Sequence, residues 1–350
     1  MEFIVASKKK ILVTGGVGFI GSHTVVELID AGYEPILLDN LSNSKIGVLK
    51  SLEKIIKRTV KFYENDCNDI SALRNIFRIE KNIVGVIHFA ANKAVGESVI
   101  DPLKYYQNNI GSLVSILSVM QEYNILNLVF SSSCTVYGQP THLPVNEDSP
   151  VLKAQSPYGN SKQICEEIIH DVYYSGKPIK AISLRYFNPI GAHHSALIGE
   201  LPLGMPNNLI PFVTQTAAGI REELTVFGND YNTPDGTCVR DYIHVVDLAK
   251  AHVKALDKLF TVKEDLFHDV INVGTGKGES VLNVIHAFEK IAGLKLNYKI
   301  GPRRAGDIQE IYADVQKSAS VLSWKAEKNM EEAILDAWNW QQNLKNLNLV

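Results

Sequence analysis

The glycine-rich segment TGGVGFIG, Thr14–Gly21, constrains the fold of this chain more than any other feature. It follows a short apolar run, Lys10–Thr14, and opens a helical pattern over Gly18–Ala31. Its glycines at positions 15, 18 and 21 allow a tight turn, close approach of the backbone to a ligand, and close packing of the helix on the strand. The N-terminus of that helix supplies unpaired N–H groups and a partial positive charge. The segment therefore predicts a strand–turn–helix unit that binds a pyrophosphate.

Short apolar runs continue to alternate with helical patterns through the first half of the chain. The further strands we expect are Glu34–Asp39, Val60–Glu64, Val84–Ala90, Asn127–Ser131 and Ile179–Arg185. Helical length and periodicity appear over Leu103–Tyr123 and Tyr158–Tyr174. Such alternation implies right-handed βαβ units and a parallel sheet. Continuous apolar runs such as VIHFAA suit strands that are buried on both faces. The predicted fold class is α/β, a doubly wound parallel (Rossmann) sheet with a smaller C-terminal α/β domain.

The second half of the chain has a different composition. Asn188–Leu209 is rich in proline, glycine and asparagine, which predicts a structured loop region. From Arg240 to about Val273 the pattern again indicates a helix followed by a strand, and this block can return to the first domain. We therefore expect a nucleotide-binding domain of residues 9–188 plus about 240–273. The second domain would comprise residues 189–239 plus 274–350 and bind the substrate.

The overall composition excludes several classes of protein. The 350 residues carry a formal net charge of −3, with 45% hydrophobic and 21% charged residues, which gives no electrostatic reason to expect nucleic acid or a membrane surface. The apolar runs are far shorter than the roughly 20 residues of a membrane helix, and the start MEFIVASKKK lacks the order of a secretory signal. Four widely spaced cysteines without a Cys-x-x-Cys pair argue against a zinc site and fit free thiols. We expect a cytoplasmic protein without a metal.

Two acidic residues follow strands near the glycine-rich turn. Asp39 ends the second predicted strand, where a carboxylate accepts hydrogen bonds from a ribose 2′-OH and repels the 2′-phosphate of NADP. The turn and Asp39 together predict NAD as the cofactor. Asp66 lies just past the third strand, and two interpretations stay open for it: a contact at the adenine end of the cofactor, or a cap for the helix that follows.

Tyr158 and Lys162 lie four residues apart at the start of a predicted helix, which places them on one face. A free tyrosine has a pKa of about 10 and is a poor base. A lysine ammonium and a positive nicotinamide ring nearby would lower that pKa. The spacing alone is common by chance, but downstream of a dinucleotide turn it indicates a proton-handling pair. Ser133 follows a strand at the edge where α/β sheets bind ligands, so its hydroxyl can bond a substrate oxygen; the alternative is a turn rich in small polar residues.

From Lys10 to about Trp340 the chain resembles the extended short-chain dehydrogenase/reductase family, and more narrowly the UDP-glucose (UDP-galactose) 4-epimerases. The first nine residues look like an addition. The segments that carry the resemblance are TGGVGFIGSHT, LDNLSNS, VIHFAANKAVGES, FSSSCTVYG, SPYGNSK, LRYFNPIGAH, NNLIPF, VFGNDY, TCVRDYIHV and RRAGD.

The resemblance implies a role for individual residues. Ser133, Tyr158 and Lys162 would be catalytic. The residues around NAD would be Gly15, Gly18, Phe19, Ile20, Gly21, Asp39, Asn40, Asn43, Ser44, Asp66, Cys67, Phe89, Ala90, Ala91, Lys93, Asn108, Ser133, Tyr158, Lys162 and Phe187. The residues around the sugar nucleotide would be Lys93, Ser133, Tyr158, Asn188, Asn208, Leu209, Thr225, Val226, Phe227, Arg240, Arg304, Asp307 and Ile311. Arginine suits the diphosphate because its planar guanidinium donates two parallel hydrogen bonds.

The resemblance also implies a reaction. Tyr158, as a phenolate, would take the proton from the sugar 4-OH while NAD accepts the hydride from C4. The flat 4-keto sugar would turn about its diphosphate link, and hydride would return to its other face. Members of the family usually keep NAD bound and form homodimers through a helix bundle, for which Leu103–Tyr123 and Tyr158–Tyr174 are the candidates.

Other activities within this family remain as alternatives. Sugar-nucleotide dehydratases carry an Asp–Glu pair after a threonine where this chain has Ser133, Cys134 and Thr135, which supply no carboxyl group. The same absence disfavours a UDP-glucuronate decarboxylase, and the intact Ser–Tyr–Lys set disfavours a non-catalytic NAD-binding sensor. Four residues after Asp307, members restricted to UDP-glucose and UDP-galactose carry tyrosine, and members that accept N-acetylated sugars carry a small residue. Ile311 is intermediate, so we expect UDP-galactose and UDP-glucose as substrates with some activity on the N-acetylhexosamine pair.

Overall fold

The computed structural model describes residues 8–304, 307–347 and 349. Residues 1–7, which make up most of the segment that looks like an addition, lie outside the described residues. The same holds for Ala305 and Gly306 of the RRAGD segment.

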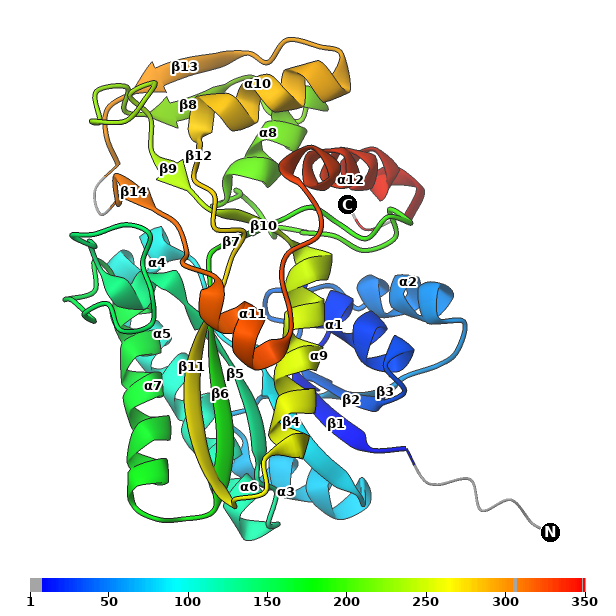
Figure 1. The fold of residues 1–350 in the computed structure, drawn as a ribbon. Helices are drawn as coiled ribbons and strands as arrows, with labels where there is room; N and C mark the ends of the chain where they lie inside the picture. Colours follow the sequence, from blue (N-terminus) through cyan, green and yellow to red (C-terminus); the bar gives the residue numbers. More distant parts are fainter. Residues whose placement is uncertain (1–7, 305–306, 348, 350) are drawn as a thin grey trace.

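A parallel sheet forms the centre of the described chain, with the strand order β11–β6–β5–β4–β1–β2–β3 (Figure 1). This confirms the predicted doubly wound sheet, and the strands predicted from sequence either match the observed ones or differ from them by at most two residues at an end. The bounds are β1 Lys10–Thr14, β2 Glu34–Asp39, β3 Lys61–Glu64, β4 Ile83–His88, β5 Asn127–Ser133, β6 Ile179–Tyr186 and β11 Leu266–Val273.

Helices cover both faces of this sheet. Because successive side chains of a strand point to opposite faces, Ile11 and Val13 pack into one apolar cluster while Leu12 packs into the other. The first cluster is covered by α1 Phe19–Asp30, α2 Gly47–Ile56, α9 Val245–Thr261 and α11 Gln316–Leu322. The second is covered by α3 Ile70–Ile79, α6 Gly111–Glu122 and α7 Pro157–Tyr174. Burial on both faces explains why these strands read as continuous apolar runs.

The helix predicted over Leu103–Tyr123 is interrupted. After α4 Val95–Ile100, Asp101 caps a short α5, Pro102–Tyr105, and the backbone then widens into a π-helical turn, η1 Tyr106–Ile110, before α6 begins. A π-helical turn inserts one extra residue and is common at functional sites. Here it contains Asn108 and the buried Asn109.

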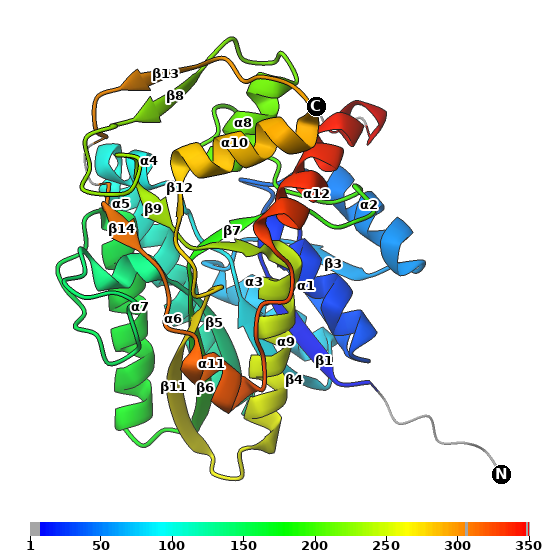
Figure 2. The ribbon, with the colours of Figure 1, turned by 45° about the horizontal axis from the view of Figure 1, so that its top comes forward.

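A smaller layer of short sheets and three helices lies over the carboxyl ends of the main strands (Figures 1 and 2). Its paired strands are β7 Asn188–Ile190 with β10 Tyr242–His244, β8 Leu224–Phe227 with β13 Tyr298–Gly301, and β9 Val239–Arg240 between β12 Glu279–Ser280 and β14 Glu310–Ile311. Its helices are α8 Leu209–Ala217, α10 Val281–Ala292 and α12 Met330–Asn343, followed by the 3-10 turn η3 Leu344–Leu347. Val213, Phe288 and Ile334 lie in its apolar core. The predicted loop region Asn188–Leu209 contains β7 and ends where α8 begins.

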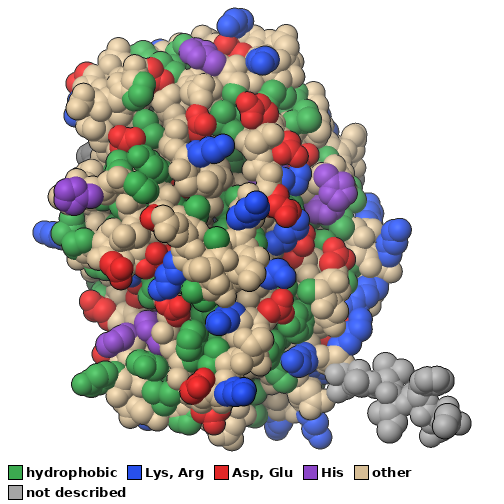
Figure 3. Space-filling model, in the orientation of Figure 1, with side chains coloured by type: hydrophobic (Ala, Val, Ile, Leu, Met, Phe, Trp, Pro, Cys, Tyr) green, Lys and Arg blue, Asp and Glu red, His purple; other side chains and the backbone are tan. Residues whose placement is uncertain are grey.

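The surface mixes charges of both signs, and the face drawn in Figure 3 carries basic and acidic side chains side by side. Within the described residues, no helix combines the length and the apolar character that crossing a membrane requires. The same residues contain no group of three or more histidine, cysteine, aspartate or glutamate side chains arranged to hold a metal ion.

Candidate active site

The glycine-rich turn connects β1 to α1 and leaves no room for side chains. Gly15 has φ +67° and donates from its backbone N–H to the Leu38 carbonyl oxygen at 2.7 Å. A Cβ atom on Gly15 would lie 3.0 Å from the backbone nitrogen of Ala90, and one on Gly21 would overlap the carbonyl oxygen of Gly15. Phe19 and Ile20 are the first residues of α1. No side chain caps the start of α1, so the first N–H groups of this helix remain available, which fits a pyrophosphate.

Asp39 ends β2 beside this turn. Its Oδ2 accepts from the Val17 backbone N–H at 3.1 Å, and its Oδ1 accepts from the Leu41 N–H at 2.9 Å and the Ser44 hydroxyl at 3.0 Å. A carboxylate has about four lone-pair sites, so these contacts leave capacity for a ribose hydroxyl. Asp39 thus joins the turn to the loop that holds Asn40, Asn43 and Ser44.

Asp66 does not cap the helix that follows it, so that interpretation is wrong. The cap of α3 is Asp69, which accepts from the backbone N–H groups of Ser71 and Ala72. Asp66 instead accepts from the Asn68 backbone N–H at 2.7 Å and from the Asn40 side chain at 2.9 Å. Burial raises the pKa of Asp66, but the hydrogen bonds from Asn68 and Asn40 outweigh it and lower the pKa below its ordinary value. This carboxylate therefore ties the loop after β3 to the loop after β2.

Cys67 is buried next to Asp66. Burial raises the pKa of its thiol to about 12, so the thiol stays protonated. The side chain therefore acts as an apolar packing group and is not a nucleophile.

The loop after β4 is held to the turn and to α7. Phe89 and Ala90 donate from their backbone N–H groups to the carbonyl oxygen and hydroxyl of Thr14, at 3.1 and 3.3 Å. Asn109 accepts from the Asn92 backbone N–H at 2.8 Å and donates to the Ser161 hydroxyl at 3.0 Å. Sequence reasoning missed Asn109, because nothing in the sequence distinguishes it from its neighbour Asn108. Asn109 lies in the π-helical turn and is buried.

The three predicted catalytic residues come from two elements. Ser156 caps α7 by accepting from the Gly159 N–H at 3.1 Å, and Pro157 occupies the first helical position, so α7 begins where Tyr158 can face the end of β5. Ser133 ends β5 and caps the 3-10 turn η2, Cys134–Tyr137. Its side chain forms a hydrogen bond with Tyr158. Lys162 is buried one turn further along α7 and donates from Nζ to the Ser131 carbonyl oxygen at 2.6 Å.

The pKa shifts of this pair run against the sequence-based expectation. Burial raises the pKa of Tyr158 to about 12, although the hydrogen bond with Ser133 lowers it. Burial lowers the pKa of Lys162 to about 8, while Cys165 and Glu166 raise it. The predicted lowering of the tyrosine pKa is therefore not produced by the protein's own groups, whose net effect is the opposite. A positive charge beside the phenol would have to overcome the burial.

Phe187 and Ile311 belong to one apolar cluster, together with Cys134 and Tyr137. Only 1% of the Ile311 surface is exposed. In the sheet β9–β14, Ile311 is paired with Arg240, whose guanidinium Nη1 donates to the Val239 carbonyl oxygen at 2.9 Å. The structure thus places Arg240 beside the residue that we expect to influence sugar choice.

The remaining predicted substrate residues surround this sheet. Arg304 donates from Nη2 to Asp307 Oδ1 at 2.7 Å, and its guanidinium lies 5.6 Å from the centre of the Phe227 ring. Val226 of β8 is buried, with Thr225 before it. Asn188 donates from its backbone N–H to the Asp241 carbonyl oxygen at 2.9 Å.

Asn208 and Lys93 are brought together by Glu200. The side chains of both donate to Glu200 Oε1, at 2.7 and 2.8 Å. Sequence reasoning missed Glu200, which lies in the proline-rich loop region outside every predicted site.

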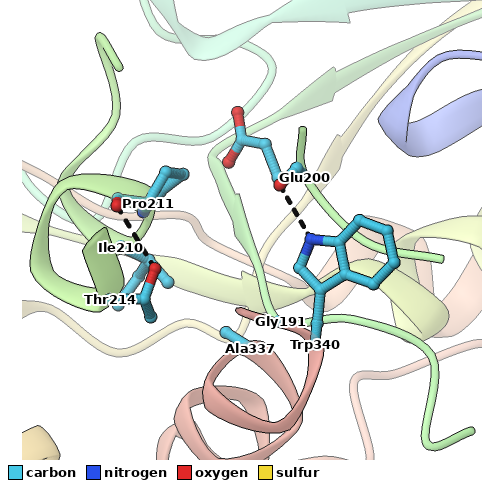
Figure 4. A pocket seen from close by; sticks show the side chains of 7 residues that line it. All are labelled: Gly191, Glu200, Ile210, Pro211, Thr214, Ala337 and Trp340. Carbon is cyan, nitrogen blue, oxygen red and sulfur yellow. Dashed lines mark hydrogen bonds between the residues drawn. The ribbon is translucent and has the colours of Figure 1, made fainter. Parts of the chain in front are cut away.

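A small pocket opens beside Glu200 (Figure 4). The pocket is lined by Gly191, Glu200, Ile210, Pro211, Thr214, Ala337 and Trp340. None of these was predicted from the sequence as a site residue. The indole N–H of Trp340 donates to the Glu200 carbonyl oxygen at 2.9 Å, and the Thr214 hydroxyl donates to the Pro211 carbonyl oxygen at 3.2 Å. The carboxylate of Glu200 points away from the indole.

Comparisons with known proteins cover nearly the whole chain. The family model described as GDP-mannose 4,6 dehydratase matches residues 12–337. The UDP-glucose 4-epimerase of Dictyostelium discoideum is 50% identical over 332 residues, which cover 95% of this chain and 95% of that protein. The UDP-glucose 4-epimerase of Bacillus subtilis is 50% identical over 333 residues, covering 95% of this chain and 97% of that protein.

Solved structures give the same result. The UDP-glucose 4-epimerase of Bifidobacterium longum, crystallised in complex with NAD+ and UDP, is 47% identical with a TM-score of 0.92, and the match covers 96% of this chain and 99% of that one. A UDP-Glc/GlcNAc 4-epimerase of Campylobacter jejuni is 36% identical with a TM-score of 0.81, covering 96% and 99%. The fold, the convergence of Ser133, Tyr158 and Lys162, and these matches lead to one conclusion: the chain belongs to the UDP-glucose 4-epimerase family.

Proposed function

We propose that this chain is an NAD-dependent epimerase that interconverts UDP-galactose and UDP-glucose at C4 through a 4-keto sugar. The observation that carries the proposal is the meeting of Tyr158, Ser133 and Lys162 at the carboxyl ends of the strands, on the same edge as the glycine-rich turn. Relatives 50% identical over 95% of the chain are named UDP-glucose 4-epimerases.

The residues of the turn fit a dinucleotide. Gly15 and Gly21 allow the turn to pack closely against the loop after β4 and against α1, and Asp39 lies beside the turn to accept a ribose hydroxyl, which favours NAD over NADP. Further along the cofactor, the proposed contacts are Asp66 and Cys67 at the adenine and Phe89, Ala90, Ala91, Lys93, Asn108 and Phe187 at the nicotinamide end. When bound, NAD supplies the hydride acceptor and a positive ring charge near Tyr158.

In the proposed reaction the protein moves one proton and orients one sugar. The Ser133 hydroxyl bonds the sugar 4-oxygen, and Tyr158 Oη takes the proton as C4 loses its hydride. Lys162, fixed by the Ser131 carbonyl oxygen, holds a positive charge in this buried environment and so favours the phenolate. The same proton returns from Tyr158 when hydride adds to the other face of C4.

The proposed anchors hold the nucleotide and leave the sugar ring free to turn. Arg240 and Arg304 bind the diphosphate, Asp307 binds a ribose hydroxyl, and Thr225 to Phe227 lie under the uracil. Asn188, Asn208 and Leu209 complete the site. Weak contacts to the sugar itself let the 4-keto intermediate present either face.

A broader epimerase that also takes N-acetylhexosamines is the first alternative, favoured by Ile311 in place of the bulky tyrosine. A dehydratase is a weaker alternative, although the matching family model carries that description. Elimination of water needs an acid and a base beside the sugar, and Cys134 and Thr135 provide no carboxyl group.

We also propose that two copies of the chain form a homodimer. Large apolar side chains are exposed on α4 and α5, which contact α7: Val99 is 63%, Ile100 is 86% and Leu103 is 68% exposed. A second copy that packs its own α5, α6 and α7 here would cover them. Sedimentation of the wild type should give a dimer, and the variant Ile100→Glu with Leu103→Glu should sediment as a monomer.

Two further proposals concern location and domains. We place the protein in the cytoplasm, since its four cysteines are free and buried, as in a reducing compartment.

We divide the chain into a cofactor domain of residues 9–188 plus about 240–273 and a sugar-nucleotide domain of residues 189–239 plus 274–350. The pairing of β11 with β6 in the main sheet supports the return of residues 240–273 to the cofactor domain. Within residues 274–350, α11 is the exception, because it packs against α9 and β11 of the main sheet.

The experiment that tests the function is product identification after incubation with UDP-galactose. The proposal expects UDP-glucose, at an equilibrium reached from either sugar. A 4-keto-6-deoxy product would indicate the dehydratase, and no turnover would indicate the sensor.

A further inference from the structure

The backbone around Glu200 is held in place by contacts that do not involve the Glu200 side chain. The loop after β7 closes on itself through an antiparallel bridge between Ala192 and Gly199 and a hydrogen bond from the His193 N–H to the Ile198 carbonyl oxygen at 3.1 Å. Gly199 lies directly against the Trp340 ring, where a Cβ atom would be 2.5 Å from the indole. The indole N–H then fixes the Glu200 carbonyl oxygen (Figure 4). The carboxylate therefore extends from a base held by α12.

One oxygen of that carboxylate binds groups from both layers of the protein. Glu200 Oε1 accepts from Lys93 Nζ, which follows β4 of the main sheet, and from the Asn208 amide, which precedes α8 of the smaller layer. The Glu200 side chain is only 10% exposed, whereas the Lys93 side chain is 47% exposed. Lys93 Nζ also lies 5.9 Å from the centre of the Phe19 ring at the pyrophosphate turn.

The contact with Asn208 changes the end of α8. An asparagine at the N-cap ordinarily accepts a hydrogen bond from the first turn of its helix. Asn208 occupies the N-cap of α8 with extended backbone but makes no such bond. Its amide is turned to Glu200, and Pro211, the third residue of the helix, has no N–H to donate. The N–H groups of Leu209 and Ile210 at the start of α8 are thereby left for a ligand.

We propose that Glu200 is a positioning residue that orders Lys93 for the cofactor and Asn208 for the sugar nucleotide before either binds. A lysine side chain loses rotamer freedom when it is fixed, so a partner that fixes it in advance strengthens binding. The proposal rests on the proposed function, since it assigns Lys93 and Asn208 to the two nucleotides. Glu200 touches neither reacting atoms nor the proton path, and therefore acts on binding.

The test is the split between KM and kcat in Glu200→Gln, which keeps the shape of the side chain and removes its charge. The expected result is a KM for UDP-galactose raised at least ~10-fold, the low end for a hydrogen bond to a charged group, with kcat within ~3-fold and an unchanged pH profile of kcat. In the Asn208→Ala background the same substitution should add little to the KM for UDP-galactose, because the residue that Glu200 orders for the sugar nucleotide is gone.

Glu80→Gln is the matched control. Glu80 has a carboxylate of similar burial, 9% exposed, which binds Lys10 Nζ at 2.8 Å and the Tyr63 hydroxyl at 2.7 Å. Lys10 starts β1, so Glu80 lies at the opposite edge of the sheet from the site. Loss of this pair should lower the thermal unfolding temperature and leave KM unchanged.

A second variant keeps the proposal testable if Glu200→Gln does not fold. Trp340→Phe keeps a ring against Gly199 and loses the N–H that holds the Glu200 backbone. Its KM should rise ~2- to 5-fold with kcat unchanged, as expected for one neutral hydrogen bond. If a folded Glu200→Gln shows wild-type KM, or effects that add fully to those of Asn208→Ala, the positioning role is wrong. A wild type that does not convert UDP-galactose would instead refute the proposed function.

Discussion

The ammonium of Lys162 lies 2.6 Å from the carbonyl oxygen of Ser131, two residues before Ser133 in β5. The last three residues of this strand therefore set the geometry of the site. Ser131 fixes the lysine through its backbone, the Ser132 hydroxyl bonds the buried Glu166, and Ser133 bonds Tyr158. Glu166 is in turn held by Arg185 Nη2 at 2.6 Å. A buried ion pair thus supports the strand end that contacts Lys162 and carries Ser133, two of the proposed catalytic residues.

Replacement of Tyr158 by phenylalanine removes the proposed base and keeps the ring. The rate of epimerisation should fall at least ~10²-fold, the low end for general acid–base catalysis, while NAD content stays as in the wild type. Tyr33→Phe is a control that loses a tyrosine hydroxyl bonded to Asp257 at 2.6 Å, away from the site, and should keep its rate. A near-normal rate for Tyr158→Phe would refute the assignment.

Gly21→Ala should break cofactor binding through a single added methyl group. That Cβ would overlap the carbonyl oxygen of Gly15 and force the turn open. We expect the purified variant to fold but to release much less than one NAD per chain on denaturation. Gly96→Ala in α4 meets nothing within 4 Å and should retain the wild-type amount. Full NAD content in Gly21→Ala would show that the turn does not hold the pyrophosphate.

Buried histidines should make the protein less stable at acid pH. Burial lowers the pKa of His252 to about 4, and that of His88 to about 3, from an unfolded value near 6.5. The unfolded chain therefore binds these protons first, so the stabilisation is complete above pH 6.5 and is lost as the pH falls toward 4. The free energy of unfolding should decrease by about 1.4 kcal/mol per pH unit for each such histidine.

His252→Leu tests this assignment by urea unfolding at pH 5 and 6.5. The side chain lies among apolar groups, 4.6 Å from Phe89 between ring centres, so leucine should be accommodated. The slope of the unfolding free energy against pH should become shallower by about 1.4 kcal/mol per pH unit, the contribution of one proton. An unchanged slope would mean that His252 also takes up its proton in the folded protein. His142→Leu, at an exposed histidine, is the control and should keep the wild-type slope.

Sugar choice should depend on Ile311. It is 1% exposed and packs in the cluster of Phe187, so a smaller residue would open space there, whereas tyrosine would fill it. We expect weak wild-type activity on UDP-N-acetylglucosamine, at least ~10-fold more relative to UDP-glucose in Ile311→Ala, and none in Ile311→Tyr. Zero activity of the wild type on both N-acetylated sugars would remove the broader specificity.

The sheet was predictable because its signals are local. Strands such as Lys10–Thr14 and Glu34–Asp39 are short, apolar and bounded by turn residues, so their observed limits match the prediction. The break of Leu103–Tyr123 into α5, a π-helical turn and α6 was not predictable, since it depends on the burial of Asn109 against Asn92 and Ser161.

The site was predictable only in part, for the same reason. Two nearby aspartates could cap α3, and the structure uses Asp69. Asp66 is instead bonded by the side chain of Asn40 from another loop, a contact between distant segments that the sequence does not show. The pKa of Tyr158 depends mainly on how deeply the phenol is buried, and the Tyr-x-x-x-Lys spacing contains no information about burial. Glu200 lies in no sequence motif. Its proposed role depends on contacts with Lys93 and Asn208, which only the fold brings together.

Epimerase activity is tested by mixing the purified protein with UDP-galactose without added NAD and following the sugar nucleotide. We predict that UDP-glucose forms catalytically, over many turnovers per chain, because one retained NAD is reduced and reoxidised in each cycle. Absence of UDP-glucose both with and without added NAD would contradict the proposed epimerase activity.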